Sequence, residues 1–464
     1  MLIDYIDIDR IVEDRRLDPI YYGLAFFNEQ IQYPLAPLKS FCLDFQSGFG
    51  AGKEEQTTEE TGIIQIRPTN IDSEGMLKYD KNVFVPYTLN KTLLEIDDVL
   101  FNNTNSQELV GKTAILKEQK KLFFSNHITR IQVDKTKAIP DYLWIILNMY
   151  QSKSVFYSIC TNWNNQSGVG IELLKSLKIP LPRREIQQQI VDLNNAAIKE
   201  KQAKEQEANE LLASIDDYLL KELGIELPVT TKNERYFEVN ILDLIGERLD
   251  PFYNNPLYAG IDEKISAAQY SFRKFKEICY SVSGVVFSCD DESEKGKAIL
   301  RGNNITLETN ELNFDSIRYI RDSLIISDNL KLQRNDILMS SASGSKEHVG
   351  KVAFIEYDMD YYFGGFMMVL RQKEKDYNQK YFFAFLQSNL FRSYLYRNLG
   401  GTNINNLNFK MLANLKIPFP PIEKQNDIAE HIKSIRVKAK QLQKDAREGL
   451  IRINTEIEKI IIRD

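Results

Sequence analysis

The chain repeats itself after about 238 residues, and this internal duplication constrains its fold more than any other feature of the sequence. The hexapeptide LKIPLP at 177–182 returns as LKIPFP at 415–420, and each copy is followed by a Gln and, three positions later, by an Ile. Shorter matches precede it in the same order, at 16–19 and 248–251, 67–71 and 301–305, 98–100 and 336–338, and 110–112 and 349–351. Because the order is kept and the offset drifts by only a few residues, we infer a duplicated domain with its connector, not a short solenoid repeat.

The overall composition is that of a soluble protein with room for more than one core. The 464 residues suffice for two or three domains, and 43% hydrophobic with 27% charged residues is ordinary for globular chains. The first residues lack the pattern of a signal peptide, and the longest apolar run, 142–147, is too short to cross a bilayer. We therefore expect a cytoplasmic protein that makes no membrane contact.

The cysteines and histidines give no sign of a metal site. The four cysteines form no C-x-x-C pair, and the three histidines are far apart. The net charge of −6 is a separate constraint, because free-standing DNA-binding proteins usually carry a basic excess. Either the chain does not bind nucleic acid, or its positive charge is local, or a partner supplies the rest.

Each copy divides into two unlike parts. The first part, 1–182 and again 226–420, combines short β-rich runs with Asn, Gly and Ser turns. Apolar residues at helical spacing predict one helix near the end of each, at 141–158 and 378–399. We expect two globular α+β domains.

The second part of each copy, 183–225 and 421–464, is predicted to be one long helix. No Pro or Gly lies between Pro182 and Gly224, and apolar residues in both segments recur every three or four positions, close to a heptad seam. Segment 183–222 has six basic and nine acidic residues, whereas 421–463 has ten basic and seven acidic, and these opposite net charges favour pairing between the two helices. If the two helices packed antiparallel, they would hold the two domains apart. A helix of about 38 residues spans roughly 57 Å, which corresponds to one to two helical turns of DNA.

No enzyme motif stands out. Segment 47–53 (SGFGAGK) resembles a glycine-rich nucleotide loop, but Ser47 replaces the first Gly of a phosphate loop and Glu54 the Ser or Thr that would hold magnesium. The tetrapeptide NPLY at 255–258 is one residue away from a methyltransferase motif, but no cofactor fold precedes it. We expect a binding protein that catalyses no reaction.

The duplicated LKIP[LF]P tail, the Q-x-x-I helix start and the long heptad helix after each mixed domain resemble the specificity (S) subunit of type I restriction–modification systems, over essentially the whole chain. The resemblance implies two target recognition domains that each read one half of a split double-stranded DNA sequence. It also implies that the paired helices dock two methyltransferase (modification) subunits and that restriction subunits join them. S-adenosylmethionine, ATP and Mg would then be bound by those partners, and no cofactor by this chain. Two alternatives remain open at this point: a methyltransferase–recognition fusion enzyme, and a structural adaptor that never touches DNA.

Candidate DNA-reading residues lie on four pairs of equivalent polar loops, which are, in order, 47–53 and 281–284, 67–70 and 301–304, 102–106 and 340–346, and 162–167 and 402–406. Arg and Lys can read guanine, Asn and Gln adenine, and Ser or Thr either, provided that a rigid scaffold presents them. We expect the third loop pair, around 102–106 and 340–346, to lie nearest DNA, and Lys112 and Lys351 to contact phosphate. In the first copy the candidates are Ser47, Lys53, Arg67, Asn70, Asn102, Asn103, Thr104, Asn105, Lys112, Asn164, Asn165 and Gln166. In the second copy they are Ser283, Arg301, Asn303, Asn304, Ser340, Ser341, Ser343, Ser345, Lys346, Lys351, Thr402, Asn403 and Asn405.

Overall fold

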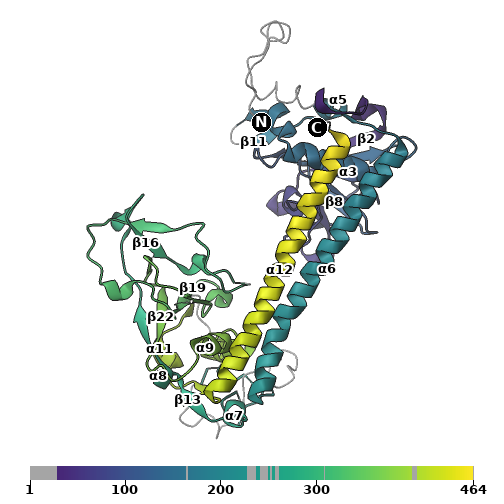
Figure 1. Ribbon diagram of the computed structural model, residues 1–464. Helices are drawn as coiled ribbons and strands as arrows, with labels where there is room; N and C mark the ends of the chain where they lie inside the picture. The colour runs from purple at the N-terminus through teal and green to yellow at the C-terminus, as the bar shows by residue number, and fades with distance from the viewer. Residues whose placement is uncertain are drawn as a thin grey trace. The chain divides into compact units, whose positions relative to one another are not determined.

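The computed structural model describes residues 29–163, 166–226, 237–240, 249–250, 253–255, 261–307, 309–399 and 405–462 (Figure 1). The chain forms two compact units: unit 1 comprises Met1–Glu205 and Gln443–Asp464, and unit 2 comprises Gln206–Leu442. The repeated motif at 16–19 lies outside the described residues, as does part of its copy at 248–251. No helix within the described ranges is long and apolar enough to cross a membrane.

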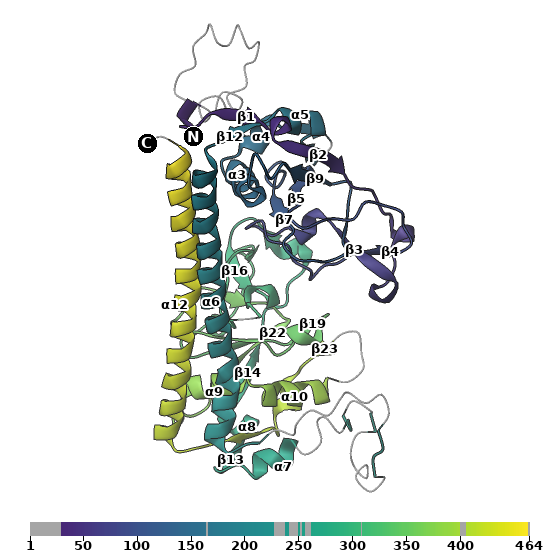
Figure 2. The same cartoon turned by 90° about the vertical axis from the view of Figure 1, so that its right-hand side faces the viewer.

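Unit 1 is built around a four-stranded antiparallel sheet, in which strands 99–102, 113–115 and 128–133 are buried on both faces and the edge strand 42–47 is partly exposed. Its central strand alternates between two cores, with Val99 and Phe101 in one and Leu100 in the other, as the two-residue period of a strand requires. A second sheet, which contains the parallel pair β3–β8, lies on the side away from α6 and α12 (Figure 2). The main sheet has the order β2 (Cys42–Ser47), β9 (Ile128–Val133), β5 (Val99–Asn102), β7 (Thr113–Ile115); the second has β4 (Phe84–Pro86), β3 (Gly62–Ile66), β8 (Phe123–Phe124); the others are β10 (Thr161–Trp163), β11 (Gln166–Gly168), β6 (Thr104–Asn105), and β1 (Leu35–Pro37) with β12 (Lys178–Pro180).

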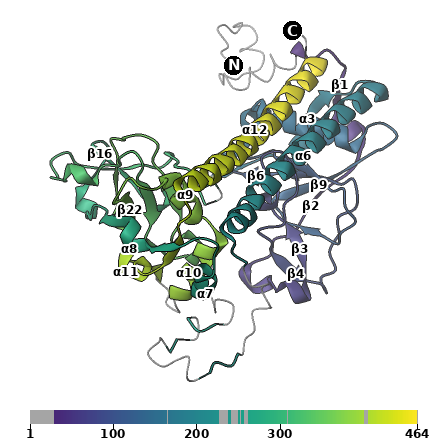
Figure 3. The ribbon, with the colours of Figure 1, turned by 60° about the horizontal axis from the view of Figure 1, so that its bottom comes forward.

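Unit 2 repeats the main sheet and the pair at its base, and its second sheet differs by one added strand, which confirms the duplication. A second sheet again lies on the side away from α12 (Figure 3). Its main sheet has the order β14 (Cys279–Ser283), β22 (Met367–Gln372), β18 (Ile337–Ser340), β20 (Val352–Phe354); the second has β15 (Glu292–Ser293), β17 (Arg318–Ile320), β16 (Lys297–Leu300), β21 (Tyr362–Phe363); the two pairs are β19 (Ala342–Ser343) with β23 (Asn405–Asn406), and β13 (Phe272–Lys274) with β24 (Lys416–Pro418).

The helix predicted near the end of each domain is broken into two. In unit 1, α3 (Pro140–Ser152) ends before Ser154, whose φ of 60° is left-handed, and α4 (Val155–Ile159) follows. In unit 2, α9 (Gln379–Phe385) stops and the Ser388 side chain caps a new helix by accepting a hydrogen bond from the N–H of Phe391. The remaining short helices are α5 (Ile171–Ser176), α7 (Ile261–Ser266), α8 (Phe275–Ile278), α10 (Asn389–Asn398) and α11 (Phe409–Leu412).

The two long helices are α6 (Arg184–Leu223) and α12 (Ile422–Ile461), and they are antiparallel. Within unit 1, Ile190 near the start of α6 shares a buried cluster with Ile457 near the end of α12. Within unit 2, Leu219 near the end of α6 shares a cluster with Ile428 near the start of α12. Ion pairs join the helices in unit 2: Lys438 Nζ lies 2.9 Å from Glu207 Oε1, and Lys424 pairs with Glu222. The predicted α+β fold with a pair of antiparallel helices is confirmed.

The duplicated hexapeptide forms the strands β12 and β24, which join each domain to its long helix. The hydroxyl of Tyr142 donates to the carbonyl of Pro180 at 2.8 Å, and in unit 2 Tyr381 donates to Pro418 at 2.7 Å. Both tyrosines are buried, so each hydroxyl needs such a partner. The motif therefore has a structural role, because it connects each domain to its long helix.

Candidate nucleic-acid interface

In unit 1 the predicted loops converge at one end of the main sheet, around a segment that sequence reasoning missed. This segment is 125–127, the turn between β8 and β9. The N–H of Asn126 donates to the carbonyl of Phe49, from the first loop, at 3.2 Å. The N–H of Asn103, from the third loop, donates to the carbonyl of His127 at 3.0 Å. Val169 joins the fourth loop to the third through its N–H and the carbonyl of Asn103, at 2.9 Å.

The same convergence occurs in unit 2, around the equivalent turn 364–366. The N–H of Gly364 donates to the carbonyl of Leu300 at 2.9 Å, beside the second loop. The N–H of Ser341 donates to the carbonyl of Phe366 at 2.9 Å, and the N–H of Leu407 donates to Ser341 at 2.7 Å. We call these two surfaces the loop faces: 47–53, 67–70, 102–106, 125–127 and 166–169 in unit 1, and 281–288, 301–304, 340–346, 364–366 and 405–407 in unit 2.

A signal for the missed turns was present in the sequence. Phe124 and Phe363 occupy matching positions at the ends of β8 and β21, and each is followed by turn-forming residues. The two turns could not be recognised as equivalent from the sequence, because their residue types differ completely between the copies, SNH in one and GGF in the other. Only the strand pairing, with Ile66 beside Phe124 and Leu300 beside Phe363, aligns them.

Two glycines allow the first loop to approach this turn. A Cβ atom on Gly48 would lie 2.0 Å from the carbonyl oxygen of Phe124. A Cβ atom on Gly284 would lie 2.1 Å from the carbonyl oxygen of Gly364. Because both obstacles are backbone atoms, only glycine fits at these positions.

The loop face of unit 1 contains a polar pocket of about 430 Å³. The Arg67 guanidinium borders it and is fixed by Gln65 Oε1, which accepts from Nε at 3.1 Å and Nη2 at 2.9 Å. Burial lowers the pKa of Arg67 from its usual value. The Ser125 hydroxyl, 3% exposed, has no hydrogen-bond partner among the residues that the structure describes. The pocket is lined by Gly50, Ala51, Gly52, Glu55, Arg67, Ser125, Asn126 and His127.

Several candidate residues are internal and hold the loops in shape. Asn70 Oδ1 accepts the N–H of Arg67 at 3.0 Å, and Asn304 Oδ1 accepts the N–H of Arg301 at 2.9 Å. Lys351 is 4% exposed, and its ammonium group donates to the carbonyl of Ile305 at 2.7 Å. Its charge is therefore not at the surface in position to meet a phosphate, contrary to the expectation from the sequence. The buried candidates are Asn70, Asn102, Asn103, Asn304, Ser340, Ser341 and Lys351.

The other described candidates are exposed or partly exposed on or beside the loop faces. They are Ser47, Lys53, Arg67, Thr104, Asn105, Lys112 and Gln166 in unit 1, and Ser283, Arg301, Asn303, Ser343, Ser345 and Lys346 in unit 2. Asn164, Asn165, Thr402 and Asn403 lie outside the described residues, and Asn405 is described only as part of the backbone of β23.

The first loop of each unit leads into an acidic segment. Lys53 is followed by Glu54 and Glu55, and the Oε2 atom of Glu55 accepts the N–H of Gly52 at 2.9 Å. In unit 2, Asp291 pairs with Arg321 at 2.7 Å. These acids leave the loop faces without a strong local excess of positive charge.

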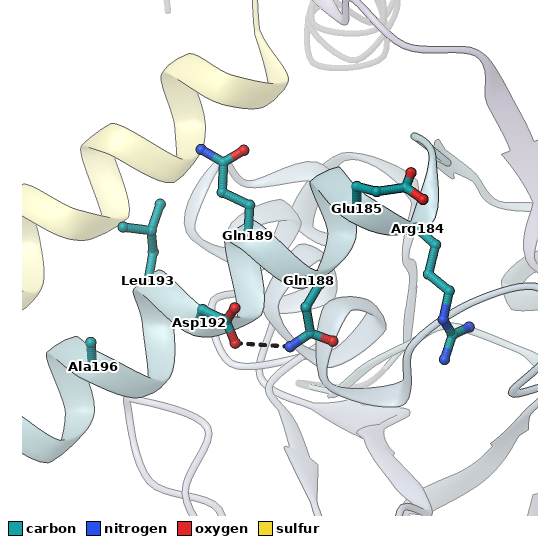
Figure 4. Close-up of a pocket in the computed structure, with 7 residues that line it drawn as sticks. All are labelled: Arg184, Glu185, Gln188, Gln189, Asp192, Leu193 and Ala196. Carbon is teal, nitrogen blue, oxygen red and sulfur yellow. Dashed lines mark hydrogen bonds between the residues drawn. The ribbon is translucent and has the colours of Figure 1, made fainter.

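A second surface depression, of about 740 Å³, lies on the first turns of α6 (Figure 4). One helix supplies all the lining residues that the structure describes, and Gln188 Nε2 donates to Asp192 at 2.8 Å within it. Side chains from a single helix face do not converge on a point, as an active site requires, so we interpret this region as an exposed polar helix surface. Its lining residues are Arg184, Glu185, Gln188, Gln189, Asp192, Leu193 and Ala196.

The comparisons with known proteins all point to one family. The family model described as type I restriction modification DNA specificity domain matches residues 78–213 and 268–448. The putative type I restriction enzyme MjaX specificity subunit of Methanocaldococcus jannaschii is 26% identical over 347 residues, which cover 74% of this chain and 73% of the relative. The EcoKI specificity subunit of Escherichia coli is 31% identical over 140 residues, 30% of this chain and 29% of the relative.

A solved structure shares the fold. A chain from a structural study of complex assembly and conformational transition of the type I restriction–modification system superposes with a TM-score of 0.53 at 14% identity, covering 93% of this chain and 98% of that one. The two segments matched by the family model also follow the duplication seen in the sheets. This chain therefore belongs to the DNA specificity family of type I restriction–modification systems, whose members recognise DNA.

Proposed function

We propose that the chain is a non-catalytic specificity subunit in which each unit reads one half of a split DNA target through its loop face. The observation that carries this proposal is the duplicated loop face: five segments meet on the same scaffold in both units, yet equivalent positions hold different side chains. A shared scaffold fixes the geometry of approach, whereas side chains at base edges determine the sequence read. Two loop faces that share a scaffold but carry different side chains suit a DNA target with two different halves.

The long helices have the surface that partner subunits would need. Apart from the residues that pack against each other or against the domains, α6 and α12 are largely exposed and polar, as the region around Gln188 shows. We propose that methyltransferase subunits dock on these helices and that restriction subunits join them. Those partners would bind S-adenosylmethionine, ATP and Mg.

The charge distribution favours a complex over a free-standing DNA-binding protein. Phosphate neutralisation supplies much of the affinity of any DNA-binding protein, and the net charge of this chain is −6. The acidic segments that follow the first loops add to this deficit. Partner subunits that hold the same duplex would supply the missing positive surface, and we expect weak DNA binding by the chain alone.

Methylome sequencing tests the proposal. A host that carries this chain with its modification subunits should methylate a gapped motif, read by single-molecule sequencing. Exchange of residues 1–182 for those of a relative should change one half of the motif and leave the other half intact. An ungapped motif, or a change in both halves, would contradict the proposal. Methyl transfer by the purified chain alone would favour a fusion enzyme instead, and an assembled complex without sequence-selective DNA binding would favour a structural adaptor.

A further inference from the structure

The two loop faces differ most at the central turn. In unit 1 this turn presents Asn126 and His127, and in unit 2 the equivalent positions are Gly365 and Phe366. Facing the turn from the first loop, Gly50 in unit 1 corresponds to Val286 in unit 2. A polar surface in one unit has thus become apolar in the other.

The two apolar residues of unit 2 are largely exposed to solvent, and both lie at the central turn. Phe366 is 76% exposed and Val286 is 88% exposed. A Cβ atom on Gly365 would lie 3.1 Å from Val286 Cγ2, so the Val286 side chain lies over the residue that precedes Phe366. Single exposed apolar residues are common, but two that flank one turn, within a ring of short polar loops, call for a ligand.

An arginine beside this pair is less constrained than its counterpart. Arg67 of unit 1 is tied to the side chain of Gln65, whereas Ile299 takes the place of that glutamine beside Arg301. The Nε atom of Arg301 is buried and has no hydrogen-bond partner within the described ranges. The Arg301 Cγ atom lies 3.7 Å from the position of a Cβ on Gly364, so the side chain lies against the same turn as Val286 and Phe366.

We propose that the loop face of unit 2 reads a thymine next to a guanine in the major groove. Phe366 and Val286 contact the C5 methyl group of the thymine, and the guanidinium of Arg301 donates to O6 and N7 of the guanine. Apolar contact with the thymine methyl and arginine paired with guanine are the contacts by which proteins recognise these bases. This inference rests on the proposed function and adds the chemistry of one half-site.

A protein partner fits this patch less well than a base edge does. Stable protein interfaces bury about 800 Å² on each side around a large apolar centre, whereas this patch consists of two side chains. Other segments of the same loop face carry small polar residues, Asn303, Ser343 and Ser345, which suit the edges and backbone of DNA.

Replacement of thymine by uracil tests the methyl contact, because the exchange removes only that methyl group. The complex of the full chain with its modification subunits is titrated with duplexes that carry its own target, with thymine or uracil in the half assigned to unit 2 by domain exchange. One buried methyl corresponds to about fourfold tighter binding of the thymine duplex. Phe366→Ala combined with Val286→Ala should make the two duplexes bind equally. Tyr357→Ala, at an exposed tyrosine outside the loop face, should retain the fourfold difference.

Arg301→Ala gives an independent measure. It should reduce discrimination at the guanine by about tenfold or more, while Lys39→Ala, in unit 1, leaves that position unchanged. A unit 2 half-site with no thymine beside a guanine, or a uracil effect that survives the double substitution, overturns the inference and leaves the proposed function standing. A complex with no sequence-selective binding contradicts both.

Discussion

The side chain of Gln187 accepts a hydrogen bond from the backbone N–H of Ile139 at 3.0 Å, and so ties the first turn of α6 to the start of α3. Its amide nitrogen donates to the carbonyl of Pro182 at 2.9 Å. Gln425 repeats both contacts in unit 2, with the N–H of Asn378 at 2.9 Å and the carbonyl of Pro420 at 2.8 Å. The glutamine five residues after each LKIP[LF]P motif is therefore a buried side chain whose hydrogen bonds connect each domain to its long helix.

Gln187→Ala should destabilise unit 1. The substitution leaves the N–H of Ile139 buried without an acceptor, which costs about 1–3 kcal/mol and lowers the melting temperature by a few degrees. Gln188→Ala, at the exposed neighbouring position, should have little effect. Thermal unfolding of the two variants side by side measures the difference, and equal melting temperatures would show that the hydrogen bonds of Gln187 contribute no stability.

The sequence predicted the parts of the fold that depend on repeated or periodic patterns. The duplication, the α+β class and the two long helices all followed from residues that recur at fixed spacing. The break between α3 and α4 did not, because both sides of Ser154 keep an apolar helical pattern and only its left-handed backbone interrupts the helix.

The loop face could be predicted only in part, because surface polarity does not distinguish a ligand contact from an internal bond. Asn70 and Lys351 have residue types that read DNA, yet both satisfy backbone groups inside the fold. In unit 2 a second reason hid the central turn: Phe366 looks like a core residue in the sequence and is 76% exposed in the structure. Tertiary placement decides the role in both cases.

Gly48→Ala and Gly449→Ala should change stability in opposite directions. A methyl group on Gly48 would collide with the backbone of Phe124, so the first loop must move, at a cost of about 1–3 kcal/mol or more. Gly449 lies in the middle of α12, and a Cβ there meets nothing within 4 Å. Alanine should therefore stabilise the helix by about 0.5–1 kcal/mol. Chemical denaturation resolves the two signs, and a destabilised Gly449→Ala variant would count against this account of α12.

In each unit a buried aspartate precedes a central strand of the main sheet, Asp98 before β5 and Asp336 before β18. The charged groups around these two carboxylates differ, and substitution should show the difference in stability. Asp336 pairs with Arg371 at 3.0 Å; burial raises the pKa of this carboxyl group, and the arginine partly offsets the shift. Asp98 holds the same position in unit 1, where burial again raises its pKa, but its neighbour on β9 is the neutral Gln132.

Asp336→Asn should therefore cost about 3–5 kcal/mol, because it leaves the charge of Arg371 buried and unbalanced. Asp98→Asn should cost less, because the buried Arg130 that acts on Asp98 keeps its ion pair with Asp44 at 2.6 Å. Urea unfolding of both variants provides the comparison. A similar loss in the two units would show that the capping hydrogen bonds, which both aspartates make, dominate over the charge pair.

Asn126→Ala should relax one base position in the half-site read by unit 1 and leave the other half unchanged. The backbone of this residue is held on both sides, by the carbonyl of Phe49 and by the side chain of Asn103, so the turn should keep its shape. Asparagine discriminates adenine from other bases by about 1–3 kcal/mol, which corresponds to a loss of about tenfold or more in selectivity. Methylome sequencing should show one degenerate position in the motif, whereas Lys39→Ala, at an exposed residue outside the loop face, should give the original motif. An intact motif in the Asn126→Ala variant would mean that the central turn of unit 1 does not reach the bases.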